Sequence, residues 1–151
     1  MIYIGIDPGS KGAMALMVNG HVTVVPYDKT AYLAHLSVIN GMKADGEDGG
    51  VICCIEQVSS HPREGVKSVF TFGTNYGWLL GVLDALQIPY QTVTPLKWKK
   101  EFSLTSDKAQ SIEVCKRLFP NVSLLRTERS RKEDDNLAEA VLLMLYAKRK
   151  F

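Results

Sequence analysis

The sequence IYIGIDPGS, at residues 2–10, defines the start of the predicted fold. Its apolar, β-branched first half is typical of a buried strand, and the following Asp-Pro-Gly is typical of a turn. Two further strand patterns, at residues 12–18 and 21–27, flank Asn19-Gly20, which is the strongest short-range signal for a β-hairpin. We therefore predict three initial strands, the last two joined as a hairpin.

The remaining chain alternates between helical and extended patterns. We expect a helix at 31–42, a loop at 43–50, a strand at 51–55, a helix from about 65 to 86, a strand at 90–94, and helices at 107–119 and 134–148. This order predicts an α/β fold, with a five-stranded mixed β-sheet flanked by α-helices. The length of 151 residues fits a single domain over residues 1–151.

Charge is distributed unevenly along the chain. The net charge is only +2, but residues 97–132 carry ten basic and four acidic side chains, for a local charge of +6. Such a segment is typical of a surface that binds the phosphate backbone of a nucleic acid, and a solvated lysine and arginine surface is the alternative.

The cellular setting follows from features that the sequence lacks. The three cysteines form no CxxC pair, which favours buried thiols in a reducing compartment over disulfides or a zinc site. No apolar stretch has the length of a membrane span, and the first residues do not resemble a signal peptide. We therefore expect a cytoplasmic protein without a targeting segment or a membrane partner.

Four carboxylates are candidates for a common site. Asp7 and Glu56 each end an apolar strand, although a turn role for Asp7 and a solvated Glu56 are the ordinary alternatives. Asp135 and Glu139 are about 40° apart around the axis of the last helix and about 6 Å apart along it, so they share a face. Asp134 points elsewhere. His61, in a polar loop, is expected at the surface, with an approach to this site as the alternative.

The chemistry of this set favours a particular class of metal. Carboxylates placed together repel one another unless a cation neutralises them, and a set without His or Cys partners favours Mg²⁺ or Mn²⁺ over zinc. Two such ions about 4 Å apart would suit hydrolysis of a phosphodiester.

Three glycines are spaced four residues apart in the helix predicted at 65–86. Gly73, Gly77 and Gly81 share one helix face, where they permit close backbone approach. We expect this face to pack on the sheet, with a helix–helix contact between two subunits as the alternative.

Five motifs follow one another along the chain: IGIDPGSKGAMAL, CCIEQV, FGTNYGWLLGVLDAL, TPLKWKK and DDNLAEAVLL. Together they resemble the RuvC family of Holliday-junction resolvases, and most of all its phage-type and chloroplast-type members. The resemblance implies a ribonuclease H-like fold and a homodimeric endonuclease that uses two Mg²⁺ ions, or Mn²⁺ in their place. Such an enzyme makes paired symmetric nicks in four-way DNA junctions; the resemblance assigns no branch-migration motor as a partner.

The resemblance also implies roles for individual residues. Asp7, Glu56, Asp135 and Glu139 would be the metal ligands, with Asp134 as an alternative to Asp135. Lys97 or Lys108 would act at the scissile phosphate, and Lys99 and Lys100 are alternatives. Phe70 or Phe72 would stack on a base at the junction centre unless they pack in the core. The expected DNA-binding residues are Lys97, Lys99, Lys100, Lys108, Phe70, Phe72, Arg129 and Arg131.

Three other functions compete with this interpretation. They are a non-catalytic module that binds junctions, a ribonuclease H-type nuclease acting on RNA–DNA hybrids, and a sugar-kinase or actin-like ATPase. The intact set of four carboxylates argues against the first. The third needs two such domains and a second phosphate motif, which a chain of 151 residues does not accommodate.

Overall fold

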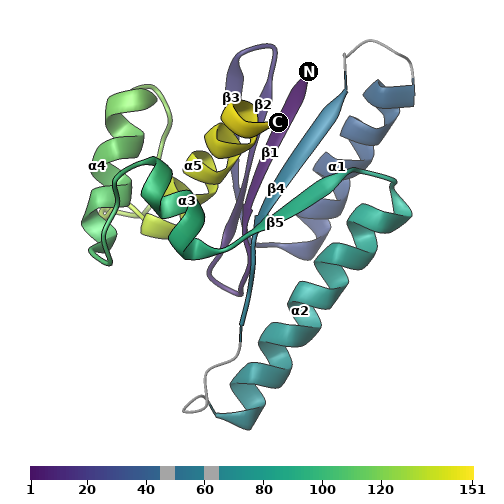
Figure 1. Cartoon of the computed structure of the whole chain (residues 1–151), viewed down its shortest axis with the longest axis horizontal. Coiled ribbons are helices and arrows are strands. Elements are labelled where there is room, and N and C mark those ends of the chain that lie inside the picture. The colour runs from purple at the N-terminus through teal and green to yellow at the C-terminus, as the bar shows by residue number, and fades with distance from the viewer. Residues whose placement is uncertain (45–49, 60–64) are drawn as a thin grey trace.

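The computed structural model describes residues 1–44, 50–59 and 65–151. Its centre is a five-stranded sheet with the order β3-β2-β1-β4-β5 (Figure 1). Neighbouring strands run antiparallel from β3 to β1 and parallel from β1 to β5, which confirms the predicted mixed sheet. The strands are β1 (Ile2–Asp7), β2 (Ala13–Val18), β3 (His21–Pro26), β4 (Val51–Glu56) and β5 (Tyr90–Val93).

Helices cover both faces of this sheet (Figure 1). The even-numbered residues of β1, such as Ile4, point to the face covered by α1 (Lys29–Ala44) and α2 (Val66–Ala85). The opposite face is covered by α5 (Asp135–Lys150), against which α3 (Pro95–Glu101) and α4 (Lys108–Leu118) pack. The alternation of β1 therefore directs Asp7 toward the face that carries α5.

Gly5 allows α5 to lie directly against the middle of β1. A Cβ atom at this position would lie 2.0 Å from the backbone nitrogen of Met144 and 2.3 Å from the carbonyl oxygen of Ala140. Both atoms belong to the backbone of α5, so no side chain could move aside to make room. Glycine at position 5 therefore sets the spacing between the first strand and the last helix.

The predicted hairpin between β2 and β3 is confirmed. Asn19 and Gly20 both have positive φ values, 49° and 83°, as the favoured two-residue hairpin turns require. The pairing of Val18 with His21 closes the hairpin around these two residues.

Three expectations differ from the structure. The short helix α3 was not predicted, because seven residues are too few to show a helical period. The predicted loop at 43–50 begins later, since α1 continues to Ala44, and residues 45–49 lie outside the described residues. The expectation that the glycine face of α2 packs on the sheet is wrong: Gly73, Gly77 and Gly81 are exposed and face open space, and Leu79 and Leu83 make the buried contact instead.

No helix in the described residues is both long enough and apolar enough to cross a membrane.

Candidate active site

Asp7 and Glu56 lie side by side at the carboxyl ends of two parallel strands. The register pairs Ile6 with Ile55, so the next residue of each strand is one of these two acids. Both side chains have the parity that points toward α5. Asp7 is 8% exposed and Glu56 is half-buried, so the first acid is almost removed from solvent.

The first turns of α5 bring two more acids to this place. Glu139 is 9% exposed, and the helix that carries it packs across β1, β2 and β4. Asp135 precedes it by one helical turn and is more exposed. The four predicted carboxylates thus lie at the same end of the sheet, where they act on one another. The residues on either side of Glu139 are buried, so the start of α5 lies against the core.

Asp134 has a different role from its neighbour. It is the N-cap of α5, where its Oδ1 accepts hydrogen bonds from the backbone and side-chain nitrogens of Asn136. Its Oδ2 accepts a hydrogen bond of 2.6 Å from Nε of Arg126, whose guanidinium also donates to the carbonyl of Lys11. These contacts occupy Asp134, which favours Asp135 as the acid of the site.

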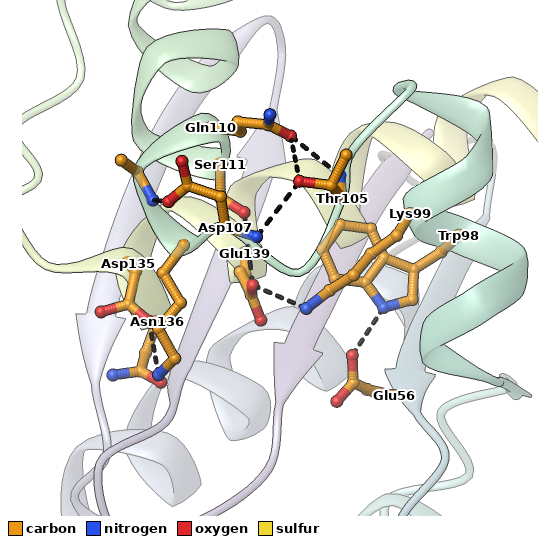
Figure 2. Close-up of polar contacts among 12 residues, drawn as sticks. Glu56, Trp98, Lys99, Thr105, Asp107, Gln110, Ser111, Asp135, Asn136 and Glu139 are labelled. Atoms are coloured by element: carbon orange, nitrogen blue, oxygen red, sulfur yellow. Dashed lines mark hydrogen bonds and ion pairs between the residues drawn. The ribbon is translucent and has the colours of Figure 1, made fainter.

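Helices α3 and α4 supply four side chains that contact the acids (Figure 2). The Nζ atom of Lys99 lies 2.9 Å from Oε1 of Glu139, and that of Lys108 lies 2.9 Å from Oδ2 of Asp135. Trp98 donates its indole N–H to Oε2 of Glu56 at 2.6 Å. The hydroxyl of Ser111 donates to Oε1 of Glu139 at 3.2 Å.

The electrostatics of the site show that the acids act on one another. Burial raises the pKa of Asp7 well above its usual value, and Glu56, Glu139 and Asp135 raise it further, whereas Lys99 opposes the change. Burial also raises the pKa of Glu56, although the hydrogen bond from Trp98 opposes this. The Asp135 carboxylate raises the pKa of Lys108. The group thus has an excess of negative charge that two ammonium groups offset only in part.

This set of donors has the chemistry of a site for a hard divalent cation. It consists of carboxylate oxygens, with no His or Cys among the residues in contact with them. The side chain of Asp7 has no hydrogen bond or ion pair within the described part of the chain. Among the described residues, no group of at least three His, Cys, Asp or Glu side chains lies closely enough together to hold a metal ion. Lys99 and Lys108 supply positive charge there instead. The types of donor atom therefore fit Mg²⁺ or Mn²⁺, and an ion at this place would share Glu139 and Asp135 with the two lysines.

The other predicted residues lie around this site in different settings. Lys97 and Lys100 are exposed on α3, and Arg129 and Arg131 are exposed in the loop before α5. None of these four contacts the acids. Sequence reasoning did not assign roles to Trp98 and Ser111, and the only signal for Trp98 was its place in the TPLKWKK motif.

The two predicted phenylalanines of α2 are in contrasting positions. Phe70 is 75% exposed, so core packing does not explain it. Phe72 is half-buried, and its ring lies 3.2 Å from the position that a Cβ atom on Gly9 would take, which places it beside the turn after β1. His61 lies outside the described residues.

The arrangement of strands and helices is a ribonuclease H-like α/β fold. Among solved structures, the chain is similar to Thermus thermophilus RuvC in complex with Holliday junction substrate, at 13% identity and a TM-score of 0.60. It is also similar to a second Thermus thermophilus RuvC structure, at 16% identity and a TM-score of 0.56. Each match covers 99% of this chain and 96% of the other. The fold is therefore RuvC-like. No protein-family model and no curated protein sequence matches the chain.

Proposed function

We propose that this protein is a Holliday-junction resolvase, an endonuclease that makes paired symmetric nicks in four-way DNA junctions. The observation that carries the proposal is the convergence of Asp7, Glu56, Asp135 and Glu139 at one edge of a RuvC-like sheet. One of the similar structures is a RuvC in complex with Holliday junction substrate, which supports branched DNA as the substrate class.

Catalysis would depend on Mg²⁺, with Mn²⁺ as a substitute and two ions in each site. Asp7, Glu56, Asp135 and Glu139 would hold the ions, which would supply an activated water and stabilise the charge that develops on the phosphate. Asp7 would be available to hold an ion, because its side chain has no competing partner among the described residues.

The two lysines at the site would have a role in each state of the enzyme. Before an ion is bound, Lys99 and Lys108 neutralise Glu139 and Asp135. With an ion held by those carboxylates, the two ammonium groups would be available to stabilise the negative charge on a nearby phosphate oxygen. The side chain of Lys108 is largely exposed, so it is better placed than Lys99 to reach DNA.

The basic segment of residues 97–132 would bind the phosphate backbone around this site. Its exposed Lys97, Lys100, Arg129 and Arg131 make no ion pair that the structure describes, so their charges are available to DNA. The exposed ring of Phe70 offers a surface on which an unpaired base could stack.

We also propose that the active form is a homodimer, because paired nicks require two sites. The exposed Gly73, Gly77 and Gly81 form a smooth face on α2 against which a second copy of the helix could pack closely. Light scattering coupled to size exclusion should give twice the monomer mass of 16.8 kDa. The substitution Gly77→Leu should shift the protein toward the monomer, and a monomeric wild-type protein would contradict the proposal.

The function is tested by cleavage of a synthetic four-way junction with each arm labelled in turn. We expect nicks at symmetric positions in two opposing strands in the presence of Mg²⁺ or Mn²⁺, and no cleavage by Asp7→Asn. A linear duplex of the same sequence and an RNA–DNA hybrid serve as comparison substrates. Binding of the junction without any cleavage would favour a non-catalytic module, and preferential cleavage of the hybrid would favour a ribonuclease H-type activity.

A further inference from the structure

Two buried hydrogen-bond donors contact the acids of the site from outside the sheet. Trp98 of α3 is 0% exposed and donates to Glu56, and Ser111 of α4 is 2% exposed and donates to Glu139 (Figure 2). Neither side chain carries a charge, and neither belongs to the set of carboxylates. Their role is therefore not explained by the proposed chemistry alone.

The bond from Trp98 is held in place by the packing of its ring. The indole lies edge-on to Phe102, with the ring centroids 6.4 Å apart and the planes at 65°. The rest of the ring is buried in the hydrophobic core between α3 and α5. An indole N–H can only donate, and it has one hydrogen; among the described residues Glu56 is the acceptor of that hydrogen. The buried ring thus fixes the position of Glu56 Oε2.

The pattern of contacts leaves one oxygen of each acid unoccupied. Trp98 takes Oε2 of Glu56, whereas both Ser111 and Lys99 contact Oε1 of Glu139. In the described part of the chain, Oε1 of Glu56 and Oε2 of Glu139 receive no hydrogen bond or ion pair. Each carboxylate therefore has one anchored oxygen and one that is available to a ligand.

We propose that Trp98, assisted by Ser111, is a positioning residue that orients Glu56 and Glu139 toward a divalent cation. This inference rests on the proposed function, since it concerns the same site. A neutral donor suits this task, because an entering cation repels the full charge of the Lys99 ammonium much more strongly than the dipole of an indole N–H or a hydroxyl. Trp98 and Ser111 keep their bonds when the ion binds, and the two anchored carboxylates present their other oxygens to it.

The two tryptophans of the chain make this proposal accessible to NMR spectroscopy. The ¹⁵N-labelled protein has two indole N–H signals, from Trp98 and from Trp78 on α2, and the Trp98→Phe and Trp78→Phe variants assign them. We expect Mg²⁺ to move the Trp98 signal and to leave the Trp78 signal in place. The movement should be absent in Asp7→Asn. A Trp98 signal that does not respond to Mg²⁺ at concentrations that support cleavage would overturn the proposal.

The contribution of Trp98 and Ser111 to metal binding is measured as a change in the affinity for Mn²⁺, with the free ion quantified by electron paramagnetic resonance. Removal of a hydrogen bond that supports a metal ligand typically weakens metal affinity by about 10–100-fold, so Trp98→Phe should raise the dissociation constant by that factor and Ser111→Ala by less. Trp78→Phe, the same substitution elsewhere, should change it by less than about twofold. The Mn²⁺ concentration for half-maximal cleavage should rise in parallel, with the maximal rate largely restored at saturation.

These measurements separate the two proposals. If Trp98→Phe binds Mn²⁺ as tightly as the wild type, Trp98 is not a positioning residue, even when the protein cleaves junctions. If Mn²⁺ binding weakens as expected but no junction is cleaved, the positioning role stands and the resolvase function is wrong. If the wild type binds no Mn²⁺, both are wrong. If Trp98→Phe does not fold, the response of the wild-type Trp98 signal decides the matter.

Discussion

Replacing Gly5 by alanine tests how closely the last helix must lie against the first strand. The substitution adds one methyl group to β1, at the point where the backbone of α5 crosses it. The new Cβ atom would be 2.0 Å from the nitrogen of Met144, whereas ordinary van der Waals contact begins at 3.4 Å. The helix would have to withdraw by about 1.4 Å, the difference between these two distances.

The cost of this movement follows from the atoms that meet. Overpacking a core typically costs about 1–3 kcal/mol, and the upper end applies here because the obstructing atoms belong to the backbone of a buried helix. For a chain of this size, a loss of about 3 kcal/mol corresponds to a fall in Tm of about 6–12 °C. Because Asp135 and Glu139 belong to the displaced helix, affinity for Mg²⁺ should fall as well.

Urea denaturation followed by circular dichroism measures the change, and Gly41→Ala is the matched control. Gly41 lies within α1 with open space around its Cβ position, so the same substitution should stabilise the protein there by about 0.5–1 kcal/mol. A loss of stability at Gly5 together with a gain at Gly41 would support the requirement for close packing of α5 on β1. If the free energy of unfolding of Gly5→Ala is within about 0.5 kcal/mol of the wild-type value, the close approach of α5 to β1 is not required for stability.

Three further predictions concern the charges of the site. Burial and the neighbouring acids raise the pKa of Asp7, so its ionised form destabilises the metal-free protein, and Asp7→Asn should have a higher Tm than the wild type at pH 7. The gain should disappear below about pH 4, where aspartate is protonated in both the folded and the unfolded state. An equal or lower Tm at pH 7 would contradict this. Burial tends to raise the pKa of Asp134, but its bonds with Arg126 and Asn136 lower it overall, so its contribution is present above about pH 4 and is lost on further acidification. Asp134→Ala should therefore cost about 1–2 kcal/mol at pH 7 and less at pH 3 in urea titrations, while Mn²⁺ affinity stays near that of the wild type; a large loss of affinity would make it a ligand in place of Asp135. Finally, a Lys97→Ala/Lys100→Ala double variant should bind junctions more weakly, with the slope of log K against log salt reduced by about 0.9 for each phosphate that the variant no longer neutralises; an unchanged slope in fluorescence anisotropy would place the DNA elsewhere.

The sequence predicted well those features that depend on local chemistry. Asn19-Gly20 specified the hairpin because both residues tolerate positive φ values, which few others do. Asp7 and Glu56 were expected at a common edge because both end apolar strands, and the parallel pairing of those strands brings them together. The shared face of Asp135 and Glu139 followed from helical geometry, and the capping contacts of Asp134 agree with its exclusion from that face.

The features that escaped prediction depend on contacts between distant segments. Helix α3 is too short for a periodic signal, and its formation depends on burying Trp98 against α5. Once that ring is buried, the helix directs Lys99 to Glu139, whereas Lys97 is about 160° away around the axis and remains at the surface. The resemblance ranked Lys97 before Lys99, and without α3 the helical geometry that separates the two lysines could not be applied.

The glycines of α2 illustrate a second limit of sequence reasoning. Their spacing places Gly73, Gly77 and Gly81 on one face, but it does not determine which face meets the sheet. Leu79 and Leu83, on the opposite side, bury more apolar surface there and decide the orientation.

The contact between the first strand and the last helix has a consequence for the order of events during synthesis. β1 leaves the ribosome early, but the sheet face that it shares with β2 and β4 remains uncovered until α5 has been made. Contacts between such distant segments form late and slowly, since a long stretch of chain must be ordered before they can form. Asp7 therefore meets Asp135 and Glu139 only after α5 has been made. A chain that ends before α5 therefore has an incomplete acidic cluster, because Asp135 and Glu139 are missing from it.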